Sequence, residues 1–185
     1  DLASQVAYHA GLAGKHALAA EAYAAGAARS LRLFAYEETV QLVAEGLSHC
    51  QYLPSHKRLL YAAQLWRSRI LAGVPVTDVS EIEQQLQQLL ADMNGLKLVE
   101  AEIVAHQALA YLNYDKDNIN ATHQQCLASL GFVPKVPRLQ AETLATNGGC
   151  LAAIGRDMER AESLLLEAQA LANRLGLSLS DIDLG

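Results

Sequence analysis

The chain has 185 residues and a formal net charge of −6, with 51% hydrophobic but only 5% aromatic and 18% charged residues. This composition is too apolar for a disordered chain, and no apolar run approaches the length of a membrane span. A membrane is therefore not an expected partner, and neither is nucleic acid, because the negative charge would repel a phosphate backbone. We expect a soluble helical protein rich in alanine and leucine.

Apolar residues recur at steps of three and four along almost the whole chain, which places them on one face of successive helices. This periodicity, with no run of strict alternation, predicts an all-α fold. The predicted helices cover residues 2–13, 16–34, 37–51, 56–73, 79–93, 96–113, 117–130, 135–154 and 156–176.

Two of the predicted helices in the first half have clear apolar faces. Residues 37–51 carry Val40, Val43, Leu47 and Cys50, and residues 79–93 carry Val79, Ile82, Leu86, Leu89 and Met93. Ser80 and Glu83 have the spacing of a capping box, and Asn94-Gly95 is expected to end the second helix.

The second half repeats this arrangement. The predicted helix 117–130 has a cluster of capping side chains at its start, Asp115, Asp117 and Asn118. The predicted helix 156–176 ends at Gly176, a residue suited to a left-handed helix terminus. Its apolar face is expected to consist of Met158, Ala161, Leu165, Ala168, Ala172 and Leu175.

The helices pair into a repeat of about 40 residues, which predicts an αα-superhelix of about four helix pairs with an additional N-terminal helix. We expect one domain over residues 1–185, cut from a longer protein. Beyond Gly176, another apolar-periodic stretch begins (Leu177, Leu179, Ile182 and Leu184). That stretch would start the next pair and cover residues 156–176. In its absence, Leu164, Leu171 or their neighbours should remain partly uncovered, and copies should associate through the C-terminal end.

Two sets of residues resemble the tetratricopeptide repeat. Thr39, Val43 and Gly46 fill that family's small–large–small pattern, as do Ala161, Leu165 and Ala168. Gly149 matches the small position where two helices cross closely, and Tyr23 and Trp66 match the large aromatic position of a first helix. The middle pairs depart from the pattern, with Ile82 and Ile119 in the first small position.

The segments 6–14, 27–31 and 166–176 also resemble the helical arrays of large bacterial signalling ATPases and of maltose-activator-type transcription regulators. This resemblance implies a regulatory array that follows a nucleotide-binding domain. The repeat architecture, together with the lack of a coherent catalytic set, predicts a module in a cytoplasmic signalling protein that docks a protein, a peptide or other domains of the same chain. The alternative that the resemblance allows is an inducer-sensing domain with a small-molecule pocket lined by Trp66 and Tyr111.

The sequence predicts no catalytic, cofactor or metal site. Gly148-Gly149 lacks the rest of a phosphate-binding loop, and Asp115–Asn118 lacks the later ligands of a calcium loop. His123 with Cys126, and His49, Cys50 and His56, do not supply four zinc ligands. Cys50, Cys126 and Cys150 are expected to be reduced and buried.

A docking function requires a set of residues on the concave face of the array. If the first helix of each pair forms that face, its groove-facing side chains come from three different helices. The residues predicted to bind are Gln64, Arg67, Tyr111, Thr143, Thr146 and Asn147.

Overall fold

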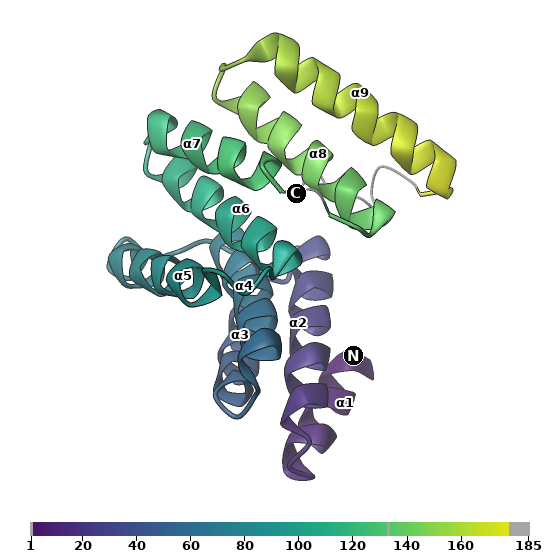
Figure 1. Cartoon of the computed structure of the whole chain (residues 1–185). Coiled ribbons are helices and arrows are strands. Elements are labelled where there is room, and N and C mark those ends of the chain that lie inside the picture. The colour runs from purple at the N-terminus through teal and green to yellow at the C-terminus, as the bar shows by residue number, and fades with distance from the viewer. Residues whose placement is uncertain (1, 133, 178–185) are drawn as a thin grey trace. The chain divides into compact units, whose positions relative to one another are not determined.

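The computed structural model describes residues 2–132 and 134–177, and within these ranges the chain is helical with no strand (Figure 1). No helix end differs from the predicted one by more than three residues, so the all-α fold is confirmed there. The helices are α1 (Leu2–Leu12), α2 (His16–Arg32), α3 (Tyr36–Cys50), α4 (Ser55–Leu71), α5 (Val79–Met93), α6 (Val99–Asp115), α7 (Ile119–Leu130), α8 (Pro137–Ala153) and α9 (Met158–Leu175).

The chain divides into two compact units, Asp1–Ala101 and Glu102–Gly185. Helix α6 begins in the first unit and continues in the second. The prediction of a single repeat domain over residues 1–185 stays a prediction. Among the described residues, no helix combines the length and the apolar character that a membrane crossing requires.

In the first unit, each of the helices α1 to α5 packs against the next, and α2 also packs against α4. Gly46 of α3 lies at a close approach to both α2 and α4. A Cβ atom at Gly46 would lie 2.8 Å from Cδ2 of Leu65 on α4 and 3.0 Å from Cβ of Tyr23 on α2. The structure confirms that this position requires a small residue, because α3 is in contact with both neighbours there.

In the second unit, α8 packs against both α7 and α9. One buried cluster draws residues from α6, α7, α8 and α9: Ala110, Cys126, Cys150, Leu151 and Ala161. A second cluster joins α8 to α9 and consists of Ala141, Ala145, Ala168, Leu171 and Ala172, with Leu144 and Leu177 packed against it. The predominance of alanine lets α8 and α9 lie close together.

One of the two predicted helix caps needs correction. The capping box at Ser80 and Glu83 does not form, because α5 begins earlier, with Asp78 as its N-cap and no side-chain cap bond. The turn leading into α5 is closed instead by the Asp78 N–H, which donates to Pro75 O at 2.9 Å. The predicted cap at Asn118 is confirmed, since its Oδ1 accepts from the Ala121 N–H at 3.2 Å.

Five helix ends close in the same way. After the last turn, one residue adopts a left-handed conformation, and the N–H of the next residue donates to the carbonyl five positions back. These bonds are Lys15–Ala10 (2.8 Å), Ala35–Ser30 (2.9 Å), Asn118–Asn113 (2.9 Å), Arg156–Leu151 (3.1 Å) and Leu177–Ala172 (3.0 Å). The left-handed residues are Gly14, Phe34, Asp117, Gly155 and Gly176. The predicted end of the last helix at Gly176 is therefore confirmed. The predicted helix 16–34 is too long at its C-terminal end, because α2 ends at Arg32 and Phe34 lies outside it.

All three cysteines are free and buried, as predicted. Burial raises the pKa of the Cys50 thiol to about 11. The hydrogen bond between Cys126 and Cys150, together with burial, raises the pKa of Cys126. Folding therefore holds these two thiols in their neutral form.

The raised pKa of Cys50 predicts a loss of stability at alkaline pH. The unfolded thiol ionises near pH 8.5 while the folded one stays protonated, so its contribution is complete below pH 8 and falls as pH rises toward 11. We expect the stability advantage of the wild type over Cys50→Ala to shrink by about 2 kcal/mol between pH 8 and pH 10.5. Urea unfolding of both proteins at pH 8 and pH 10.5 measures the difference in unfolding free energy. The ionisation of tyrosines and lysines cancels from this difference because both proteins contain the same ones. An advantage that is constant across this pH range would contradict the prediction.

Candidate docking groove

The inner face of α9 is fixed against α8 by a close crossing at Gly148. A Cβ atom there would lie 2.9 Å from Cγ of Leu165 and 3.2 Å from the carbonyl oxygen of Ala161. At Gly149 a Cβ would have no neighbour within 4 Å. The small position at the helix crossing is therefore Gly148, and its assignment to Gly149 was wrong by one residue.

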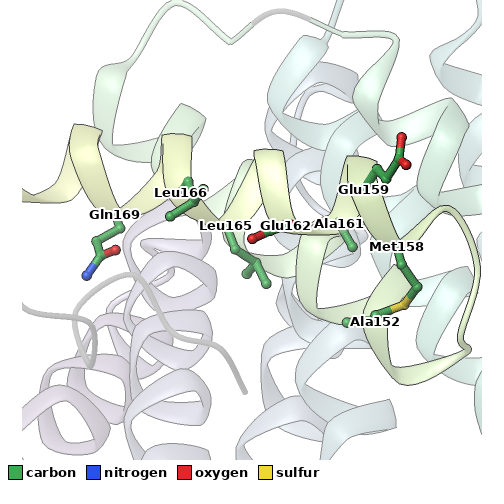
Figure 2. Close-up of a pocket in the computed structure, with 8 residues that line it drawn as sticks. All are labelled: Ala152, Met158, Glu159, Ala161, Glu162, Leu165, Leu166 and Gln169. Carbon is green, nitrogen blue, oxygen red and sulfur yellow. The ribbon is translucent and has the colours of Figure 1, made fainter.

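Beside this crossing, α9 carries an apolar groove of about 440 Å³, and Ala161 and Leu165 belong to both the crossing and the groove. Two of its apolar side chains are largely exposed, Met158 by 55% and Leu166 by 59%, and Leu165 is half-buried. Figure 2 shows the lining side chains along the length of α9, with one contribution from the end of α8. The lining residues are Ala152, Met158, Glu159, Ala161, Glu162, Leu165, Leu166 and Gln169.

The charge at the groove has one sign. Glu159 and Glu162 line it, and no lysine or arginine is among its lining residues. Both glutamates are exposed, so their carboxylates stay hydrated at the edge of an apolar surface. Such a groove favours an apolar partner segment flanked by lysine or arginine.

This groove was missed because the predicted core face of α9 was partly wrong. Ala161, Ala168 and Ala172 are buried, but Met158 is 55% exposed and Leu175 is 40% exposed. Among the side chains predicted as candidates for partial exposure, Leu164 is half-buried, whereas Leu171 is buried. The consecutive Leu164-Leu165-Leu166 was a usable signal, because residues 100° apart on a helix cannot all face one core. The stretch beyond Leu177 lies outside the described residues.

The residues predicted to bind are distributed over both units. In the first unit, Gln64 and Arg67 are half-buried on α4, and the Gln64 amide donates to Oε1 of Glu100 at 3.3 Å. Nε of Arg67 is buried without a hydrogen-bond partner among the described residues. In the second unit, Tyr111 is half-buried on α6.

The structure brings Thr143, Thr146 and Asn147 together on α8, but all three are buried, so they do not line an open surface. Oγ1 of Thr143 donates to Leu139 O at 2.7 Å, and the Asn147 amide donates to Thr143 O at 2.8 Å and to Oγ of Ser129 at 3.1 Å. That any of the predicted residues contacts a ligand stays a prediction.

Two of the histidines discussed as possible metal ligands, His49 and His123, have other partners. Nδ1 of His49 lies 2.9 Å from Nδ1 of His16, and Nε2 of His123 lies 2.7 Å from Oδ2 of Asp157. Within the described part of the chain, no three His, Cys, Asp or Glu side chains are grouped so that they could hold a metal ion.

Comparison with known proteins gives no assignment. No family model, no curated protein and no solved structure matches this chain. The chemistry of the groove on α9 is therefore the main guide to function.

Proposed function

We propose that this chain is a non-catalytic helical-repeat module that docks a protein or peptide segment, or another domain of its own chain, in the groove on α9. The observation that carries the proposal is the exposed apolar surface around Met158 and Leu166, bordered by two carboxylates. Contiguous apolar surface of this kind, edged by polar groups, is typical of protein interaction sites.

The dimensions of the groove favour a helical partner. Its lining residues extend from Met158 to Gln169, which corresponds to about 16 Å of helix axis. A partner helix of about three turns could align along it and place apolar side chains at positions i, i+3, i+4 and i+7 in the groove. Its flanking lysines or arginines would then lie near Glu159 and Glu162.

We propose in addition that the module belongs to a tetratricopeptide-like array in a cytoplasmic signalling or transcription-regulatory protein. The packing of α3 against both neighbours at Gly46, the contact of α2 with α4, and the recurring helix ends support such an array. An inducer-sensing pocket is the second candidate, because 440 Å³ lies within the range of small-molecule sites. The exposure of Met158 and Leu166 favours docking over an enclosed ligand.

A labelled amphipathic peptide tests the docking groove. We expect an 18-residue helical peptide with leucines on one face and flanking lysines to bind the wild type, as measured by fluorescence anisotropy. Leu166→Gln removes apolar contact and should weaken binding about tenfold, or about 1.4 kcal/mol. The same peptide with flanking glutamates should bind more weakly than the lysine form.

Leu175→Gln is the matched control, because Leu175 is exposed on the same helix but does not line the groove. It should change the affinity by less than about twofold. Equal effects of the two substitutions would contradict the proposal.

A further inference from the structure

Phe34 has a backbone conformation that suits it poorly. Its φ is 58°, in the left-handed region, where a bulky side chain is strained. At the four other helix ends closed by the same hydrogen bond, this position holds glycine three times and aspartate once. The fold therefore accepts a residue without a large side chain at this position.

Burial of the phenyl ring does little to offset this backbone strain. Phe34 is 76% exposed, and next to it Leu33 is 67% and Tyr36 44% exposed. The ring of Phe34 meets the ring of Tyr36 edge-on, with centroids 6.3 Å apart. We call Leu33, Phe34 and Tyr36, which lie where α2 ends and α3 begins, the apolar corner. Strained and exposed apolar residues of this kind are typical of functional contacts.

The apolar corner and the groove on α9 are complementary. The corner projects apolar side chains and is preceded by the exposed Arg32, whereas the groove is apolar and lined by Glu159 and Glu162. A cavity of about 150 Å³ accommodates benzene, so a groove of about 440 Å³ can receive Phe34 and Leu33 together. The match in charge is confined to the Arg32 side of the corner, because the exposed Glu37 and Glu38 on its other side carry the same charge as Glu159 and Glu162. These two glutamates also disfavour an anionic lipid surface.

We propose that the apolar corner of one copy inserts into the groove on α9 of a second copy. This inference rests on the proposed docking function and names the occupant of the groove. The two surfaces differ, so each copy still has an unused corner or groove after one contact has formed. Association is therefore head-to-tail, and it either closes into a ring or extends as an open chain.

Sedimentation velocity over a wide concentration range tests this contact with the whole chain. We expect the mean mass of the wild type to rise with concentration above that of the monomer. Phe34→Gly and Leu166→Gln should each weaken association at least tenfold. Phe34→Gly should also raise the melting temperature, because glycine relieves the left-handed strain, so its loss of association cannot reflect unfolding. Val76→Ala, at a residue 91% exposed elsewhere, should associate like the wild type.

The most specific test is to mix the two proteins that are deficient in association. The Phe34→Gly protein retains its groove and the Leu166→Gln protein retains its corner, so an equimolar mixture should form heterodimers and nothing larger. A charge exchange gives a second check: Arg32→Glu and Glu162→Arg should each weaken association, and the two substitutions combined in one chain should restore it.

A wild type that stays monomeric, a Phe34→Gly protein that associates like the wild type, or a mixture without heterodimers would each overturn the inference. If the lysine-flanked peptide still binds the groove in that case, the proposed docking function stands. If the peptide does not distinguish Leu166→Gln from Leu175→Gln, the docking function fails whatever the mass distribution.

Discussion

Gly148→Val should destabilise the chain by about 2–3 kcal/mol, because it places a branched side chain where α8 and α9 cross most closely. Even its Cβ would lie 2.9 Å from Cγ of Leu165 and 3.2 Å from the backbone oxygen of Ala161. A backbone atom cannot rotate away as a side chain can, so α9 as a whole would have to shift. Urea denaturation measures the loss of unfolding free energy.

The neighbouring glycine is the control for this substitution. Gly149 also lies inside α8, but a Cβ there would have nothing within 4 Å. Gly149→Ala should therefore stabilise the chain by about 0.5–1 kcal/mol, the usual gain from replacing glycine inside a helix. If both variants lost stability, α8 would tolerate no side chain at either position. That result would contradict the conclusion that only Gly148 faces the crossing with α9.

A second large effect is expected where α3 meets α4. Leu65 is fully buried, and its two methyl groups lie where a Cβ at Gly46 would be, at 2.8 and 2.9 Å. Leu65→Ala should cost about 3 kcal/mol through lost burial and the cavity it leaves. Gly46→Ala should cost about 1–2 kcal/mol in the wild type through overpacking.

The two substitutions should not be additive. Once Leu65 is shortened, the methyl group at position 46 enters vacated space, so Gly46→Ala should become less costly by at least about 1 kcal/mol. Part of its cost should persist, because Cβ of Tyr23 remains 3.0 Å away. A double-mutant cycle by chemical denaturation measures the coupling, and Val76→Ala at an exposed site should stay within about 0.5 kcal/mol of the wild type. Additive effects of the two substitutions on the unfolding free energy would contradict a contact between position 46 and the Leu65 side chain.

The helices of this chain could be predicted from the sequence because their signals are local. Apolar residues at steps of three and four, and capping residues such as Asn118 and Gly176, act within one or two turns of the backbone. Gly46 was also predictable as a small position, since it lies in a regular pattern with Thr39 and Val43. These features do not depend on how the helices later pack.

The rest was decided by tertiary contacts between residues far apart in sequence. Which of Gly148 and Gly149 faces the crossing depends on the rotation of α8 against α9, and one residue changes that direction by about 100°. The same rotation buries Asn147 against Ser129 and leaves Leu166 on the open side of α9. Helical periodicity fixes which residues share a face, but only the neighbouring helix determines whether that face is covered. The sequence alone therefore determined the helices, whereas the groove on α9 and the exposed corner at Phe34 became visible only once the helices were packed.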